Sequence, residues 1–215
     1  MKKVKIEKIY KILKSFSESA QAPVKEIKKV QAVNPYKILI SGILSTRTKD
    51  ETTISACKRL FSKVKNIVSL GKLSTKEIEQ LIYPVGFYMT KAKNLKKLSK
   101  IIQKDFKGKI PNTIEKLLKL PGVGRKVANL VLSVAFKKPA ICVDTHVHRI
   151  MNRLGYIKTK SPLETEMALR KKLPKKYWRK INYFLVFLGQ SICTPKFPKC
   201  EECPIKKYCN KIGLN

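Results

Sequence analysis

Two glycines, one residue apart and preceded by a proline, restrict the fold of this sequence more than any other feature. They lie in segment 120–126 (LPGVGRK), between two stretches with apolar residues at helical spacing. Such a turn often only caps a helix, but it also leaves the N–H groups of the next helix open to a phosphate. We expect a helix–hairpin–helix unit that binds a nucleic-acid backbone without reading its sequence. The residues predicted to bind are Gly122, Val123, Gly124 and Arg125.

Apolar residues recur at helical spacing through nearly the whole chain. Segment 4–16 has an amphipathic stripe, and 177–189 reads as the last long helix. Helix starts are marked by capping signals, such as Asn112 followed by Glu115. Segment 140–143 is too short and isolated to make a convincing strand. The sequence therefore predicts an all-α fold.

The chain is strongly basic, with 48 Lys and Arg against 14 Asp and Glu and a net charge of +34. Such a charge favours a polyanionic partner, and nucleic acid is favoured over a membrane surface even if part of the excess is solvated lysine. The apolar runs are too short to span a bilayer, and no signal-peptide core is recognisable. We expect a cytoplasmic, nucleoid-associated monomer.

The six cysteines fall into two groups. Cys57 and Cys142 stand alone in apolar surroundings and are expected in the core. The other four lie within 17 residues and predict a metal site rather than disulfides. They are Cys193, Cys200, Cys203 and Cys209. A four-cysteine iron–sulfur cluster is favoured over zinc, because zinc sites usually have two close cysteine pairs and this spacing has one.

Lys126 lies in the first turn of the helix that follows the hairpin. In a lysine-rich chain it reads first as a solvated side chain. A helix N-terminus and nearby cations disfavour an ammonium ion, however, and a neutral amine is a nucleophile that can form a Schiff base.

Segment 143–149 (VDTHVHR) supplies a second candidate site. Asp144 is placed to cap a helix and could also stabilise a developing cation or assist a nucleophile. His146 is expected to contact phosphate or to be structural, because no third metal ligand stands at suitable spacing.

With these motifs in order, residues 34–209 resemble the endonuclease III family of base-excision DNA glycosylases. The hairpin 120–126, the aspartate motif 143–146 and the cysteine spacing carry the resemblance. It implies a two-lobed helix–hairpin–helix glycosylase fold with a DNA cleft between the lobes. One lobe would be a six-helix barrel (28–138), and the other a discontinuous helical domain (1–27 and 139–215) with a [4Fe–4S] cluster.

The resemblance also implies a reaction on duplex DNA that contains damaged bases or abasic sites. A damaged pyrimidine would be flipped out, Lys126 would attack C1′ and form an imine, and Asp144 would assist. β-Elimination would then cut the strand 3′ to the lesion, which is the AP lyase activity. Adenine-mismatch relatives lack the lysine, and 8-oxoguanine glycosylases generally lack the cysteines. A T(U)/G mismatch glycosylase and a non-catalytic damage sensor remain as alternatives.

Two residues depart from the family pattern. Arg47 stands in Leu44-Ser45-Thr46-Arg47-Thr48 where many bacterial relatives have glutamine, and Phe87 stands where they have a leucine wedge. Arg47 can donate to an orphaned base and Phe87 can stack, so we expect both to contact DNA. Lys196 and Lys199, between the cysteines, are expected to contact phosphates.

Overall fold

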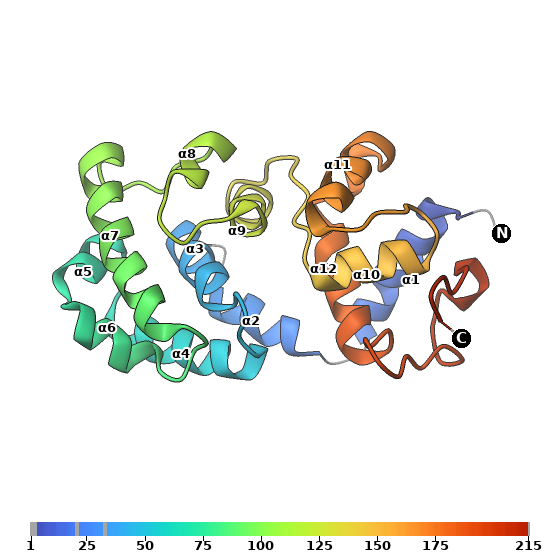
Figure 1. Cartoon of the computed structure of the whole chain (residues 1–215), viewed down its shortest axis with the longest axis horizontal. Helices are drawn as coiled ribbons and strands as arrows, with labels where there is room; N and C mark the ends of the chain where they lie inside the picture. The colour runs from blue at the N-terminus through green and yellow to red at the C-terminus, as the bar shows by residue number, and fades with distance from the viewer. Residues whose placement is uncertain (1–3, 20–21, 32–33, 215) are drawn as a thin grey trace. The chain divides into compact units, whose positions relative to one another are not determined.

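The computed structural model describes residues 4–19, 22–31 and 34–214. All regular structure in these ranges is helical, and they contain no strand (Figure 1). The predicted all-α class is therefore confirmed. None of the helices in this part of the chain is both long and apolar enough to span a bilayer.

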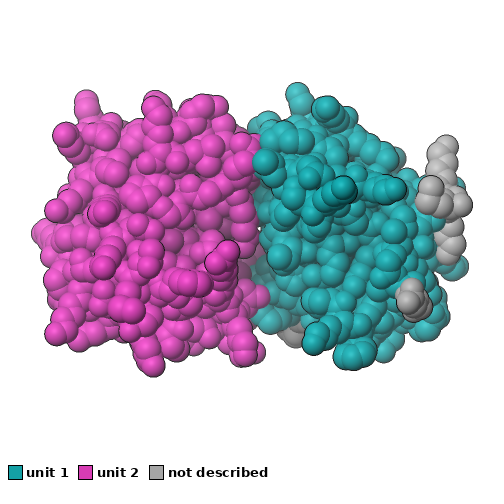
Figure 2. Space-filling model, in the orientation of Figure 1, with its two compact units in different colours: residues 1–24, 139–215 teal, residues 25–138 magenta. Residues whose placement is uncertain are grey.

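The chain divides into two compact units, which have different colours in Figure 2. Residues 25–138 form one, here named the hairpin unit, and residues 1–24 with 139–215 form the other, the cysteine unit. The domains predicted from the sequence differ from these units only in residues 25–27. The division into two domains that each fold independently, as the sequence suggests, remains a prediction.

The hairpin unit is built around one buried helix, α3. Its helices, with α2 crossing the unit boundary, are α2 (Pro23–Gln31), α3 (Pro35–Leu44), α4 (Asp50–Lys63), α5 (Ile67–Lys72), α6 (Thr75–Ile82), α7 (Tyr88–Phe106), α8 (Ile114–Leu118) and α9 (Arg125–Leu130). The side chain of Asn34 caps α3, and every residue from Ile38 to Leu44 is buried. Helices α4, α7 and α9 pack on α3. Gly42 allows α9 to approach closely, since a Cβ there would lie 3.1 Å from Val127 Cγ1.

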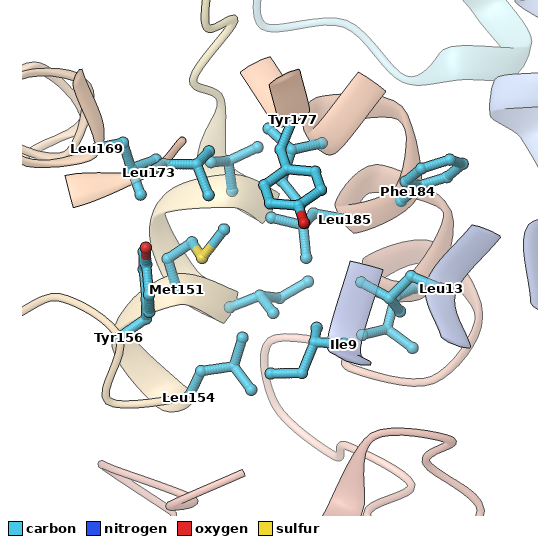
Figure 3. Packing of buried hydrophobic residues seen from close by; sticks show 14 of the residues in the cluster. Ile9, Leu13, Met151, Leu154, Tyr156, Leu169, Leu173, Tyr177, Phe184 and Leu185 are labelled. Carbon is cyan, nitrogen blue, oxygen red and sulfur yellow. The ribbon is translucent and has the colours of Figure 1, made fainter. Parts of the chain in front are cut away.

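The cysteine unit has a single apolar core between α1, α10 and α12. Its helices are α1 (Ile6–Ser19), α10 (Thr145–Arg153), α11 (Pro162–Lys172) and α12 (Trp178–Ser191). Ile9 and Leu13 of α1 are fully buried and face Met151 of α10 and Leu185 of α12 (Figure 3). Cys193, Cys203 and Cys209 are partly buried against the same core. The core therefore supports the cysteine loop directly.

Local structure departs from the sequence-based expectation in two places. The apolar stretch after the hairpin reads as one continuous helix, but it is α-helical only from Arg125 to Leu130, and Val131–Ala135 forms a π-helical turn. The cap of α8 is Thr113, not the predicted Asn112: the Thr113 hydroxyl accepts from the backbone N–H of Lys116 at 3.4 Å. A hydroxyl at Thr113 stands three residues before Lys116, which is the spacing that an N-cap requires.

Candidate active site and cysteine-lined pocket

The glycine hairpin forms an open turn between α8 and α9. Gly122 has a φ of +78°, and a Cβ there would lie 3.3 Å from Asn94 Nδ2, so the turn needs glycine at this position. Gly124 is the N-cap of α9 and contributes no capping side chain. A Cβ on Gly124 would meet no atom within 4 Å. Both glycines are exposed while Val123 is buried, and the N–H of Val123 donates to Leu120 O at 3.1 Å within the turn.

Lys126 is half-buried in the first turn of α9, where the sequence predicts it. It lies near a second lysine, the buried Lys91 of α7. Burial, with a smaller effect of the Lys126 charge, lowers the pKa of Lys91 to about 8. The structure therefore brings two amines together close to the hairpin, and only Lys126 belongs to a recognised motif.

Asp144 is the N-cap of α10 in the cysteine unit. Its Oδ1 accepts from the backbone N–H groups of His146 at 3.0 Å and Val147 at 2.9 Å. Its Oδ2 accepts from Asn182 Nδ2 of α12 at 3.3 Å. One carboxylate oxygen thus fixes the helix end, and the other is oriented by an amide. The half-buried carboxylate keeps a position suited to stabilising nearby positive charge.

His146 is held against α12 by a glycine. A Cβ on Gly189 would lie 2.3 Å from His146 Nδ1, and Arg149 Nη2 lies 3.1 Å from the same nitrogen. His148 has a different environment, with its Nδ1 2.7 Å from the Thr165 hydroxyl. These contacts give His146 a structural role. Contact between His146 and DNA remains a prediction.

Arg47 and Phe87 are neighbours although 40 residues separate them in the sequence. The Arg47 guanidinium lies 5.7 Å from the centroid of the Phe87 ring. Both side chains are exposed, Phe87 by 63%, so Phe87 is not a core aromatic. Both residues also have positive φ, 50° for Arg47 and 59° for Phe87. The two departures from the family pattern thus form one exposed pair.

The four clustered cysteines line one pocket of the cysteine unit. They are Cys193, Cys200, Cys203 and Cys209. No disulfide is formed among the cysteines of the described ranges. Burial raises the pKa of the Cys203 thiol to about 11, and the other three cysteines add to this effect. Arg153 Nη1 lies 3.4 Å from Cys193 Sγ, and the backbone N–H of Lys211 points at Cys209 Sγ at 3.4 Å.

The cysteine sulfurs that line the pocket are placed to act as ligands of a metal cluster, with hydrogen-bond donors around them. In the described part of the chain, no group of three or more His, Cys, Asp or Glu side chains is arranged to hold a single metal ion. The arrangement that is present is four thiols around a common space, with N–H donors directed at two of the sulfurs. Thiolates with N–H donors around them are the ligands of iron–sulfur clusters.

The loop between the first two cysteines carries an exposed basic and aromatic surface. Lys196 and Lys199 are exposed, and Phe197 between them is 84% exposed. Arg153 fixes the base of the loop by donating to the carbonyls of Thr194 and Pro195, at 2.7 Å each. This geometry leaves both lysines accessible to a phosphate, as the sequence suggests, while their binding to DNA stays a prediction.

Known proteins match this chain over most of its length. Residues 40–175 match the family described as HhH-GPD superfamily base excision DNA repair protein. Endonuclease III of Thermotoga maritima is 49% identical over 176 residues, which cover 82% of this chain and 83% of the relative. The chain belongs to the endonuclease III family. It spans 57% of the length of endonuclease III homolog 2, chloroplastic, of Arabidopsis thaliana, at 43% identity over 94% of this chain.

Solved endonuclease III structures have the same fold. A non-covalent endonuclease III–DNA complex is 34% identical, with a TM-score of 0.84 over 96% of this chain and 94% of that one. A trapped endonuclease III–DNA covalent intermediate, in an estranged-adenine complex, is 39% identical, with a TM-score of 0.78 and coverage of 83% and 84%. As a member of the endonuclease III family, the protein is a base excision DNA glycosylase with AP lyase activity.

Three residues around these sites carry no signal that sequence reasoning could use. Asn182 reaches Asp144 from 38 residues away, Arg153 reaches the cysteine loop from 40 or more, and Lys91 is one lysine among many. Their roles depend on how endonuclease III helices pack, which periodicity does not specify.

Proposed function

We propose that this protein removes oxidised pyrimidines from duplex DNA and cuts the strand 3′ to the abasic site through a Schiff base on Lys126. The observation that carries this proposal is the position of Lys126, in the first turn of the helix behind an open glycine hairpin. Its support from relatives is the covalent intermediate trapped between an endonuclease III and DNA.

The proposed reaction starts with the neutral Lys126 amine, which attacks C1′ of the damaged nucleotide. The glycosidic bond breaks, and the base leaves with the bonding electron pair and takes up a proton. Ring opening of the sugar and loss of the proton from nitrogen give an imine between Lys126 and C1′. Removal of a proton from C2′ then expels the 3′ phosphate oxygen, and this β-elimination cuts the strand.

Asp144 would act on charge in the first step. A carboxylate stabilises the positive charge that builds on the sugar as the base departs, or accepts the proton released from the attacking amine. The two hydrogen bonds at Oδ1 and the one from Asn182 at Oδ2 hold it in a single orientation. A preoriented carboxylate need not reorganise during the step.

Binding to damaged or abasic duplex DNA would use the backbone of the hairpin and two groups of side chains. Gly122 and Gly124 would present N–H groups to a phosphate, with Arg125 beside them. The N–H of Val123 donates to Leu120 O at 3.1 Å, so Val123 would contribute by closing the turn that presents the two glycines. Arg47 and Phe87 would fill the space that the flipped nucleotide leaves in the base stack. We propose that the protein acts as a monomer, with 28–138 and the remainder as its two domains.

The cysteine pocket would hold a [4Fe–4S] cluster through its four thiolates. When bound, such a cluster cross-links four points of the loop and can exchange an electron. Residues of this chain do the rest: Arg153 and the N–H of Lys211 stabilise thiolate charge, and the loop displays Lys196 and Lys199 toward DNA phosphates.

The cluster gives a direct spectroscopic prediction. The purified protein should be yellow-brown, with broad absorption near ~400 nm that is lost in Cys203→Ala. Cys142→Ala in the same unit is the control and should keep the colour, because Cys142 lies outside the pocket. A colourless protein with one equivalent of zinc would instead support the zinc alternative.

A panel of defined duplexes tests the substrate. We expect base release and strand cutting on a thymine-glycol duplex to be at least about tenfold faster than on a G·T or G·U mismatch, a difference that pocket contacts can supply. Faster turnover on the mismatch would favour the T(U)/G glycosylase. Binding to every duplex without release of any base would favour a damage-sensing protein.

A further inference from the structure

Lys91 is a buried lysine that the proposed reaction leaves without a role. It lies in the first turn of α7 and is only 6% exposed. Its ammonium group donates to Leu44 O at 2.8 Å, to Thr46 O at 2.6 Å and to Thr48 Oγ1 at 3.1 Å. Each of its three N–H donors therefore has an oxygen partner, which is the condition for burying an ammonium ion.

These acceptors belong to the end of α3 and to the loop that carries Arg47. Thr46 and Thr48 precede and follow Arg47 in the sequence, so Lys91 forms hydrogen bonds to the chain on both sides of Arg47. Leu44 is the last residue of α3, where a cation is favoured by the carbonyl end of the helix. The backbone N–H of Lys91 in turn donates to Phe87 O at 2.9 Å. A single residue thus links the segments that carry Arg47 and Phe87.

A second link runs through Thr48 and Gly86. The Thr48 hydroxyl, which contacts the Lys91 ammonium, also accepts from the backbone N–H of Gly86 at 3.2 Å. Gly86 lies so close to the Arg47 backbone that a Cβ would come within 2.4 Å of Arg47 O. Only glycine permits this approach, and it brings the Arg47 loop against the start of α7.

The pair held in this way is strained. Non-glycine residues avoid positive φ, yet Arg47 and Phe87 both adopt it. Such a backbone conformation is destabilising and persists only where its surroundings fix it. The hydrogen bonds from Lys91 and the close packing of Gly86 supply that constraint. Two strained, exposed residues held side by side are typical of a functional surface rather than of a core.

We propose that Lys91 is a positioning residue for base excision, which holds Arg47 and Phe87 as one preformed wedge that enters the DNA stack. The proposal rests on the proposed function of Arg47 and Phe87 in replacing the flipped nucleotide. A preformed wedge avoids the entropic cost of ordering two side chains and their loops at the moment of binding. Lys91 therefore acts through these two residues and not on the sugar.

Lys91→Met tests the proposal, with Lys96→Met as its matched control. Lys96 lies on the same helix and also donates to backbone carbonyls, those of Gly71 at 2.7 Å and Leu73, but it touches neither wedge segment. We expect Lys91→Met to slow single-turnover base release from a thymine-glycol duplex by about 10- to 10²-fold, the scale of a 1 Å misplacement. Borohydride trapping on a single-stranded abasic oligonucleotide, which needs no wedge, should stay within about twofold. Lys96→Met should leave both rates unchanged.

Thr48→Val keeps the test decisive if Lys91→Met folds poorly. It removes only the hydroxyl shared by Lys91 and Gly86 and should give a smaller loss of the same kind. Equal losses in base release and in trapping for both variants, or no loss in either assay, would overturn the positioning role. Unchanged base release in Arg47→Ala and Phe87→Ala would instead show that the proposed wedge function has failed, whatever Lys91 does.

Discussion

Replacement of Lys126 by glutamine should abolish the covalent adduct that borohydride traps on abasic DNA, and strand cutting with it. The amide of glutamine cannot form an imine, so no residual adduct is expected at this position. Binding to abasic duplex should weaken only modestly, because the loss of one cation changes the slope of log K against log[salt] by only about one. Gel-shift titration and borohydride trapping measure the two effects separately.

Lys119→Gln is the matched control for the lysine. Lys119 is exposed at the end of α8, on the other arm of the hairpin, and its loss removes the same charge. Its adduct yield should equal that of the wild type. An adduct undiminished in Lys126→Gln would assign the Schiff base to another amine, and Lys91, the buried neighbour, would be the first to test.

Asp144→Asn should separate the two roles of this residue. Asparagine is as good an N-cap as aspartate, so its side-chain oxygen can still accept from His146 and Val147. The free energy of unfolding should therefore change little. The negative charge is lost, however, and base release should slow by about 10²- to 10⁴-fold, as for other positioned acid–base groups. Thermal unfolding and single-turnover base release provide the comparison.

Asp144→Ala removes the cap as well as the charge. It should lower the free energy of unfolding by about 1 kcal/mol relative to Asp144→Asn while giving a similar loss of base release. Base release at the wild-type rate in Asp144→Asn would show that the carboxylate serves only to cap α10.

The sequence is informative where function depends on local geometry. The hairpin, the cap at Asp144 and the cysteine spacing are each contained in a short segment, and the all-α class follows from periodicity over the whole chain. Rules that use only neighbouring residues can still misplace a feature by one position: Thr113, and not Asn112, caps α8. They also miss the π-helical turn at Val131–Ala135, whose apolar residues read as ordinary helix.

Contacts between distant segments are what the sequence could not provide. Lys91 stands in a helix with several other lysines, and only tertiary packing directs its ammonium to the Arg47 loop. The proximity of Arg47 and Phe87 depends on Gly86, which in the sequence reads only as a helix interruption. Asn182 reaches Asp144 because α12 packs on α10, a pairing that hydrophobic periodicity leaves open.

Helix α10 spans the distance between two chemically different parts of the cysteine unit. Asp144 caps its first turn, and Arg153 at its last residue donates to Cys193 Sγ and to the loop carbonyls. Nine residues of α-helix rise about 13.5 Å, and inserting or deleting one residue turns the far end by about 100°. A change in length here would misalign the aspartate or the cysteine loop. We therefore expect α10 to keep its length in descendants of this protein.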